Sequence, residues 1–541
     1  MKDRLFAQRH VRIKILMYTV FLLYGVIFFR LFQLQVDQKY FLAEKAQKQH
    51  HDVEVIRPVR GIFHDRNKKP LVFNQKSWDI ALIPAQKKID EKSKKQLFEK
   101  YPEIAKKLSA EKWGSFCWLE RQASSDKKEL IEHVIPAVVS FVSSKRYYPY
   151  EHSAHLLGFT NIDGKGLAGL ELLYSTTLAG KTGKKVSMRQ GKKSKKTFNE
   201  TVVKPCLSGE SILLTIDERL QSVAYQVLSE KVDEVQAEYG SVMIVDPTSG
   251  EVLSMVSYPS FDQHQVKKED LEKSINRATN VSWEVGSVIK GLLALAALDE
   301  ELVTPDSLID CSCTTTKLGG ITVKHTRNMG KIPFGEVIQK SNNIGVAKVG
   351  LQLHGRLYDH YKKLGLGAKT ALSFPGQDAG YLRSPDHWSR PTPVVLSFGY
   401  EVSVTVAQLA QAFSIIANNG VKVPITLLMS DSSGKNEQLY RDSIVQDTKD
   451  ILERVGRRFG LPGYRVMGKT GTARLIKDGA YSSQHHIYTF GGIVEKGDYK
   501  RVIITMVKEP EKKGLLAAQI TAPLFRVIAE RMVAIEQANL F

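Results

Sequence analysis

Residues 283–298, WEVGSVIKGLLALAAL, combine two features that rarely occur together. From Gly291 onward the stretch is apolar on every side, as in a helix buried in a protein core. Its first turn nevertheless carries Ser287 and Lys290. Because residues three apart share one face of a helix, we expect the hydroxyl and the amine to lie within hydrogen-bond reach. The two side chains are therefore predicted to act as one unit.

The length and charge of the chain limit what this unit can be. A chain of 541 residues is predicted to form two or three domains, at about 100–200 residues each. Its net charge of +20 could indicate a nucleic-acid partner. However, 12 of these 20 charges fall within residues 1–14 and 181–204, and the rest of the chain is only mildly basic. Nucleic acid is therefore not expected as a partner.

An apolar segment near the N-terminus predicts a membrane anchor. Residues 15–29 are uncharged and continue past Arg30 as LFQLQV, which approaches the roughly 20 residues that span a bilayer if Arg30 snorkels. A cleaved signal peptide is the alternative, but no small-residue cleavage site follows in residues 31–49. Five basic residues precede the run, so the positive-inside rule predicts a cytoplasmic N-terminus. We expect a cytoplasmic tail at 1–14, a transmembrane anchor at 15–36 and all later residues in the periplasm.

The chain beyond the anchor changes character near Lys204. Residues 37–204 mix short strand-like runs with polar helical ones, which predicts a pedestal domain of mixed α/β structure. Residues 205–541 contain strongly apolar elements separated by clear turns, which is the pattern of a single large core. The boundary between the two domains is therefore placed at 204/205.

Two β-hairpins are predicted in the second domain. SVMIVD and VLSMVS are joined by turn residues 247–250, and HIYTFGGIV and RVIITMV are joined by residues 495–500. A closing helix is expected at 515–535. Other helices are expected around Ser287, after Ser341 and over 404–418. Strands at both ends with helices between them predict an α+β fold, with an antiparallel sheet covered by helices.

Two further motifs accompany Ser287 and Lys290. QKSNNIGVAKVG places Ser341 and Asn343 at the start of a helical run. MGKTGTARL begins a strand-like run and contains Lys469, Thr470, Gly471 and Thr472. Each motif alone is weak, and Ser341 could simply be a helix N-cap. The order S-x-x-K, S-x-N, K-T-G is the signature of penicillin-binding proteins and serine β-lactamases, in which the serine is the nucleophile.

The chemistry of acyl transfer explains the first two motifs. The Ser287 hydroxyl is a weak nucleophile at neutral pH and needs a neighbouring base. Lys290 can serve if burial and nearby cations lower its pKa, so that the amine is already neutral. Ser341 and Asn343 are then placed to relay protons to the leaving amine and to hold Lys290 in position.

The third motif supplies substrate-binding groups. Lys469 offers a positive charge to a substrate carboxylate, and Thr470 and Thr472 offer hydroxyls. Gly471 lets the substrate backbone lie close to the strand. The backbone N–H groups of Ser287 and Thr472 are expected to form the oxyanion hole.

No metal or cofactor site is predicted. The four cysteines, at positions 117, 206, 311 and 313, include no C-x-x-C pair of the kind that binds zinc. Cys311 and Cys313 could form a disulfide in an oxidising compartment, or could remain two small, partly buried side chains. His485 and His486 are adjacent in a strand-like run, so they point to opposite faces and are not expected to bind one metal ion together.

Together these motifs make the chain similar to a class B penicillin-binding protein along nearly its whole length after the anchor. RGIFHDRN at 60–67 matches the family's first pedestal motif, and 166–183 resembles its G-x-x-G-L-E segment. FPGQDAG followed by LSFGYEVSVTVAQLAQAFSIIANNG resembles the septal, cell-division member more than the elongation member. One departure is Val285, where the family usually has proline; this could loosen the turn before Ser287 and alter the acylation rate.

The resemblance implies a fold, a reaction and partners. The fold is an elongated pedestal of the penicillin-binding protein dimerisation type, followed by a transpeptidase domain similar to serine β-lactamases. The donor would be a peptidoglycan stem peptide ending in D-Ala-D-Ala, which acylates Ser287 before the amine of a second stem resolves the acyl-enzyme. β-Lactams would be inhibitors. A membrane glycosyltransferase and other cell-division proteins would be partners.

Other functions share these motifs. An elongation-type transpeptidase or a D,D-carboxypeptidase would differ only in its site of action or in accepting water. A β-lactamase or β-lactam sensor would use the same three motifs, but would gain little from a large pedestal. A non-catalytic division scaffold would not need intact motifs.

Overall fold

The computed structural model describes residues 2–82, 116–134, 138–189, 197–429, 436–477, 479–511 and 514–538, with a few isolated positions between 92 and 102. Backbone contacts divide the chain into two compact units. The first unit comprises Met1–Val59 and Gly180–Gly209, and the second comprises Arg60–Ala179 and Glu210–Phe541. Residues 60–179 therefore pack in the same unit as the region that carries the three motifs.

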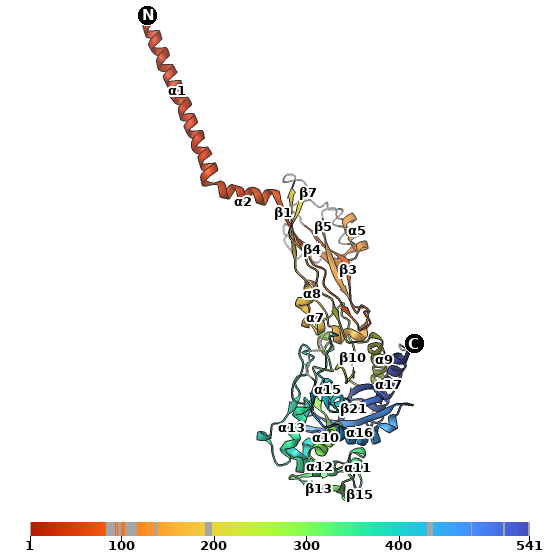
Figure 1. Ribbon diagram of the computed structural model, residues 1–541. Coiled ribbons are helices and arrows are strands. Elements are labelled where there is room, and N and C mark those ends of the chain that lie inside the picture. The colour runs from red at the N-terminus through yellow and green to blue at the C-terminus, as the bar shows by residue number, and fades with distance from the viewer. Residues whose placement is uncertain are drawn as a thin grey trace. The chain divides into compact units, whose positions relative to one another are not determined.

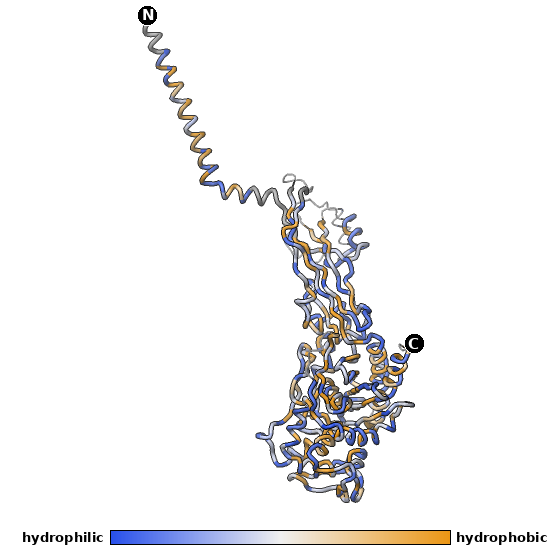
Figure 2. The backbone as a smooth tube through the Cα atoms, viewed as in Figure 1, coloured by the Kyte–Doolittle hydropathy of each residue, from blue (hydrophilic) through white to orange (hydrophobic). Residues whose placement is uncertain are grey.

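The first unit begins with a long apolar helix. Helix α1 (Lys2–Phe32) runs through a π-helical turn (Gln33–Asp37) into α2 (Lys39–His50), and Figure 2 shows apolar residues along α1. Within the described chain, Arg9–Asp37 is the one helical stretch long and apolar enough to cross a membrane. This matches the predicted single-pass anchor.

A small sheet completes the first unit. Its antiparallel order is β1-β6-β7. The strands are β1 (His51–Ile56), β6 (Gly183–Arg189) and β7 (Thr197–Lys204).

The second unit is built on a five-stranded antiparallel sheet of order β10-β9-β22-β21-β20. The strands are β9 (Tyr239–Val245), β10 (Val252–Tyr258), β20 (Arg465–Lys477), β21 (Ala480–Lys496) and β22 (Tyr499–Lys508). Both predicted hairpins are confirmed, as the pairs β9–β10 and β21–β22. Strand β20 lies at one edge of the sheet, so one side of its backbone is left without a strand partner.

Helices cover both faces of this sheet (Figure 1). Helices α9 (Glu218–Glu234) and α17 (Thr521–Ala538) pack on one face, where Val242 and Ile244 of β9 point. Helices α15 (Val406–Ala417) and α10 (Lys290–Asp299) lie on the other face, toward Met243 and Val245. Because successive strand residues alternate between faces, β9 contributes to both cores. The predicted α+β fold is confirmed.

Smaller elements lie around and beyond α10. The helices are α11 (Phe334–Gln339), α12 (Asn343–Leu353), α13 (Gly355–Lys363), α14 (Thr392–Leu396) and α16 (Asp442–Gly456). One of them, α16, also packs against strand β20 of the sheet. A three-stranded sheet contains β11 (Trp283–Glu284), β17 (Val402–Val404) and β16 (Tyr381–Leu382). Three two-stranded ladders pair β12 (Leu308–Cys311) with β15 (Gly330–Pro333), β13 (Thr315–Leu318) with β14 (Ile321–Lys324), and β18 (Val421–Lys422) with β19 (Glu437–Gln438).

The closing helix begins later than predicted. Helix α17 starts at Thr521, six residues after the expected start at residue 515. Residues before it form tight turns, in which the Gln519 N–H donates to Leu516 O at 2.8 Å. Pro523 then falls in the first helical turn, where its missing N–H costs no hydrogen bond. The apolar periodicity was thus right, but the turn chemistry set the boundary.

Residues 60–179 form their own sheet and a group of short helices. The antiparallel sheet has the order β4-β3-β5, with β3 (Phe73–Leu82), β4 (Cys117–Ala123) and β5 (Val138–Tyr147). The helices are α5 (Ser125–Val134), α6 (Ala154–Leu157), α7 (Gly169–Leu173) and α8 (Ser175–Ala179). Strand β2 (Phe63–His64) pairs in parallel with β8 (Ile212–Leu213), which joins this region to the chain entering α9.

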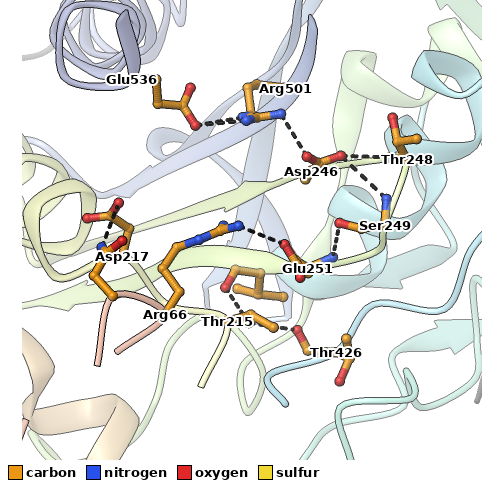
Figure 3. Close-up of polar contacts among 12 residues, drawn as sticks. Arg66, Thr215, Asp217, Asp246, Thr248, Ser249, Glu251, Thr426, Arg501 and Glu536 are labelled. Atoms are coloured by element: carbon orange, nitrogen blue, oxygen red, sulfur yellow. Dashed lines mark hydrogen bonds and ion pairs between the residues drawn. The ribbon is translucent and has the colours of Figure 1, made fainter. Parts of the chain in front are cut away.

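Ion pairs connect these segments near the turn of the β9–β10 hairpin (Figure 3). Arg66 donates to Glu251 at 3.1 Å, just after the turn. Arg501 of β22 donates to Asp246, just before the turn, at 2.8 Å and to Glu536 of α17 at 2.8 Å. The turn is therefore fixed to residues that lie far from it in the sequence.

A buried carboxylate organises residues 60–179. Glu171 of α7 has no exposed side-chain surface. It accepts hydrogen bonds from Arg60 Nε at 2.8 Å and Nη2 at 2.6 Å, and from Arg146 Nε at 2.7 Å. Both arginines are themselves nearly buried. This single carboxylate is therefore the shared counter-charge of two guanidinium groups that are largely removed from solvent.

Glu171→Ala should destabilise the protein by about 3–5 kcal/mol, because it leaves two buried guanidinium groups without their counter-charge. Chemical denaturation of the full-length protein in detergent measures the change. Glu269→Ala is the matched control, since Glu269 and its partner Lys267 are both largely exposed and 3.8 Å apart; it should change stability by less than about 0.5 kcal/mol. Equal effects of the two substitutions would contradict the assigned role of Glu171.

Candidate active site

The turn that carries Ser287 is a 3₁₀ helix, η5 (Gly286–Ile289), and α10 begins at Lys290. Gly286 has φ +58°, and a Cβ atom there would lie 2.7 Å from Thr472 O. Only glycine combines this backbone conformation with so close a contact. Partly exposed Ser287 is therefore held directly beside the strand that carries the K-T-G motif.

Valine is accommodated at the position where proline was expected. Val285 has φ −75°, which lies within the range that proline adopts. Its side chain is buried. The substitution therefore keeps the backbone that enters the Ser287 turn.

Lys290 is fully buried at the start of α10, and its neighbours through Leu298 are buried as well. Its Nζ donates to Ser341 O at 2.8 Å, to Ser341 Oγ at 3.1 Å and to Asn343 Oδ1 at 2.6 Å. Among the hydrogen bonds of the described residues, none joins Lys290 to Ser287. The amine is thus positioned by the S-x-N motif, one turn below the serine hydroxyl that we expected it to contact.

Ser341 occupies a special position before α12. It has φ +55°, in the left-handed region that side-chain-bearing residues rarely adopt. The helix N-cap is the next residue, Asn342, whose side chain accepts from Gly345 N–H. The Ser341 side chain therefore stays free of capping and accepts from both Lys290 Nζ at 3.1 Å and Lys469 Nζ at 3.2 Å. One hydroxyl links the two lysines.

The K-T-G motif lies inside edge strand β20. Lys469 is 1% exposed and also donates to Thr470 O at 3.1 Å. A Cβ atom on Gly471 would lie 3.0 Å from Val288 N and Val285 O, so the absent side chain lets the Ser287 turn approach. The Thr472 carbonyl points toward Gly286, away from β21. In an antiparallel strand the N–H of a residue points to the same side as its C=O, so Thr472 N–H faces the turn.

All eight predicted residues therefore lie in one cluster. Ser287, Lys290, Ser341 and Asn343 come from two helix starts, and Lys469 to Thr472 come from the sheet edge. Asn343 is anchored further, because its Nδ2 donates to Lys324 O at 3.3 Å.

Burial lowers the pKa values of both lysines. Burial, with the Lys469 charge as the smaller cause, holds the pKa of Lys290 well below its usual value. Burial lowers the pKa of Lys469 to about 7. A neutral Lys290 amine can still use all three contacts: its two N–H groups can donate to Ser341 O and Asn343 Oδ1, and its lone pair can accept the hydroxyl proton of Ser341. The site therefore suits an amine that acts as a base.

Sequence reasoning missed three residues at the site. Gly399 accepts from the Gly286 N–H at 3.0 Å, and its φ is +93°. Glu284 precedes the Ser287 turn and contacts two other segments. His325 follows Lys324, and burial together with the Lys290 charge lowers the pKa of its imidazole. The glycine within FGYEV is a sequence signal for Gly399. No local pattern indicates the contacts of Glu284 or the position of His325.

The described residues contain no group of three or more histidine, cysteine, aspartate or glutamate side chains arranged to hold a metal ion. All four cysteines are described, and each is a free thiol. Cys311 and Cys313 are therefore not bridged in this structure.

Comparison with known proteins identifies the family. Residues 240–528 match the penicillin-binding protein transpeptidase domain, and residues 55–214 match the penicillin-binding protein dimerisation domain. The chain belongs to the penicillin-binding protein family. It thus carries both domains that the resemblance to class B members implied, with a transpeptidase domain around the eight clustered residues.

Relatives of this penicillin-binding protein extend over nearly the whole chain. It is 30% identical to the probable peptidoglycan D,D-transpeptidase PbpC of Pseudomonas aeruginosa, over 97% of this chain and 96% of that protein. It is 27% identical to the peptidoglycan D,D-transpeptidase FtsI of Escherichia coli, over 92% of this chain and 87% of that protein.

Solved structures share the fold. Penicillin-binding protein 3 of Mycobacterium tuberculosis, complexed with aztreonam, matches with a TM-score of 0.69 at 25% identity, over 90% of this chain and 97% of that one. A peptidoglycan synthetase from Bifidobacterium adolescentis matches with a TM-score of 0.72 at 22% identity, with the same coverage. The fold class expected from the sequence is therefore confirmed by structures as well as by the family models.

The two lysines predict a bell-shaped pH profile for penicillin labelling. Acylation should fall at low pH as Lys290 becomes protonated and stops acting as a base. It should also fall above about pH 7, where Lys469 loses the charge that attracts a carboxylate. The second-order rate constant of labelling, measured from pH 5 to 10, gives both limbs.

Lys469→Arg separates the two limbs, because arginine stays charged throughout this range. The variant should lose the alkaline limb and keep the acid one. A wild-type profile that is flat from pH 6 to 9, or an alkaline limb that persists unchanged in an active Lys469→Arg protein, would contradict the assignment.

Proposed function

We propose that this penicillin-binding protein is a membrane-anchored peptidoglycan D,D-transpeptidase that cross-links stem peptides through an acyl-enzyme on Ser287. The observation that carries the proposal is the Ser341 hydroxyl between Lys290 and Lys469, beside an edge strand that contacts the Ser287 turn. The names of the relatives PbpC and FtsI support the same activity. β-Lactams acylate the same serine, in keeping with the aztreonam complex of penicillin-binding protein 3.

Acylation begins at the Ser287 hydroxyl. Neutral Lys290 takes its proton as Ser287 Oγ attacks the carbonyl of the penultimate D-Ala. The N–H groups of Ser287 and Thr472 hold the oxyanion that forms. Lys469, in its charged form, binds the carboxylate of the terminal D-Ala.

Collapse of the tetrahedral intermediate releases the terminal D-Ala. The Ser341 hydroxyl donates a proton to the leaving amine, and protonated Lys290 returns a proton to Ser341, with which it is hydrogen-bonded. The amine of a second stem then attacks the acyl-enzyme, and its proton passes back to Ser287 by the same groups in reverse. Asn343 keeps the Lys290 amine in place through both steps.

The cellular role follows from the anchor and the relatives. We assign the enzyme to the division septum for two reasons. The chain is similar to FtsI, and FPGQDAG at 374–380 with the segment that begins at Leu396 resembles the septal family member. The basic residues before the anchor favour a cytoplasmic N-terminus and a periplasmic catalytic domain. A membrane glycosyltransferase and other division proteins are the proposed partners, since cross-linking needs newly made glycan strands.

Ser287→Ala should abolish covalent labelling by fluorescent penicillin without unfolding the protein, because only one oxygen is removed. Lys290→Ala should also suppress labelling, and the double variant should be little worse than either single one, because groups that act as a unit are not additive. Lys469→Ala should instead mainly weaken binding.

Intact mass should show one persistent β-lactam on the wild type. A folded Ser287→Ala protein that kept the adduct would exclude this nucleophile, and rapid release of hydrolysed drug would favour a β-lactamase.

The orientation is tested by labelling introduced cysteines, after the four native cysteines are replaced by serine. Ser249→Cys lies in the exposed β9–β10 turn and should react with a membrane-impermeant maleimide in cells whose outer membrane alone is opened. His10→Cys is the matched control before the anchor and should react only after lysis. The opposite pattern would reverse the proposed topology.

A further inference from the structure

A single carboxylate oxygen joins three distant segments next to the Ser287 turn. Glu284 lies on β11, three residues before Ser287. Its Oε1 accepts the main-chain N–H of Glu401 at 2.9 Å and the hydroxyl of Tyr481 at 3.0 Å. These donors follow Glu284 by 117 and 197 residues. Glu284 therefore connects the strand that leads into the turn with two parts of the fold that local sequence does not bring together.

The first of these parts is the loop that holds the Ser287 turn. Its residue Gly399 accepts from the Gly286 N–H, and a Cβ atom there would lie 2.1 Å from Gly286 O. Glu401 ends the loop with φ +57°, a conformation that costs free energy in a residue with a side chain. Its own carboxylate is fixed by Arg383 at 3.1 Å and by the Thr392 hydroxyl at 2.9 Å. The loop is thus rigid, and Glu284 attaches to it.

The second part is the outer half of the β20–β21 hairpin. Tyr481 of β21 pairs with Ile476 of β20, beyond the K-T-G motif on the same strand. Its ring packs edge-on against Tyr400, with ring centroids 4.9 Å apart. The Tyr481 hydroxyl therefore ties the arm of the substrate-binding strand to the strand that leads to Ser287.

We propose that Glu284 is a positioning residue, which fixes the Ser287 turn against strand β20 for acylation. The proposal rests on the proposed function, in which Ser287 attacks a carbonyl whose oxyanion is held by N–H groups from both elements. In this role Glu284 does not itself contact the substrate. It sets the spacing between nucleophile and oxyanion donors through Tyr481 and the main chain of Glu401.

The two hydrogen bonds require an acceptor oxygen but no negative charge. Burial raises the pKa of Glu284, and the nearby Glu401 carboxylate acts in the same direction. Among the ion pairs of the described residues, none involves Glu284. A glutamine can accept both hydrogen bonds through its amide oxygen, whereas an alanine can accept neither. Comparing the glutamine variant with the alanine variant therefore tests whether Glu284 acts through its hydrogen bonds or through its charge.

The step that should respond is acylation rather than initial binding. A misplacement of about 1 Å at reacting atoms can cost about 100-fold in rate. In the proposed function, initial binding of a β-lactam depends on Lys469 and on β20, and none of the hydrogen bonds of the described residues joins the Glu284 side chain to either. Removal of Glu284 should therefore lower the acylation rate constant k2 and leave the dissociation constant K of the noncovalent complex nearly unchanged.

The experiment measures fluorescent-penicillin labelling of the full-length protein in detergent, over a range of drug concentrations that separates k2 from K. Glu284→Ala should lower k2 at least tenfold and change K less than twofold. Glu284→Gln should stay within threefold of the wild-type k2. Tyr481→Phe keeps the ring packing but loses one hydrogen bond, so k2 should fall about threefold or more.

Tyr381→Phe is the matched control. Tyr381 lies on β16 of the same small sheet, and its hydroxyl makes no hydrogen bond within the described chain. The control should label like the wild type. If Glu284→Ala fails to fold, as judged by its melting temperature, the comparison of Tyr481→Phe with Tyr381→Phe still decides the question.

Three results would overturn the positioning role. They are an unchanged k2 in folded Glu284→Ala, a loss in Glu284→Gln as large as in Glu284→Ala, or equal k2 values for Tyr481→Phe and Tyr381→Phe. Ser287→Ala, measured in parallel, keeps the two hypotheses apart. Labelling that persists in Ser287→Ala would reject the proposed nucleophile. If Ser287→Ala is not labelled but Glu284→Ala has a normal k2, only the positioning role is rejected.

Discussion

Two buried lysine side chains share the hydroxyl of one partly exposed serine. Lys290 and Lys469 are both almost completely buried, and each lies within hydrogen-bond distance of Ser341 Oγ. Two charged ammonium groups at this separation would repel each other strongly in a medium of low polarity. The arrangement is therefore favourable only if at least one amine is neutral. When both amines are charged, the neighbouring elements have to hold them together against their repulsion.

Much of the fold that holds Lys290 and Lys469 close together could be predicted from the sequence. The hairpins β9–β10 and β21–β22 follow from alternating apolar residues around obvious turns, and the fully buried α10 follows from an uninterrupted apolar run. The cluster of Ser287, Ser341 and Lys469 was also accessible, because three motifs in a fixed order are more specific than any one of them. These signals are local, or depend only on order along the chain.

Other features depend on contacts that no local pattern reveals. Ser341 has a left-handed backbone conformation, and Lys290 donates to Ser341 and Asn343 rather than to Ser287. The contact of Gly399 with Gly286 joins residues more than 100 positions apart. The start of α17 was placed six residues early, because apolar spacing says little about where turns end. Each of these depends on tertiary contacts or on turn chemistry.

Strand β20 is the edge strand of a large sheet, and an uncovered edge can pair with a strand of another chain. Here the turn Gly286–Ile289 lies across that edge at Gly471 and Thr472. The catalytic turn thus also protects the protein against edge-to-edge aggregation, and a variant that displaced it would be expected to lose solubility as well as activity.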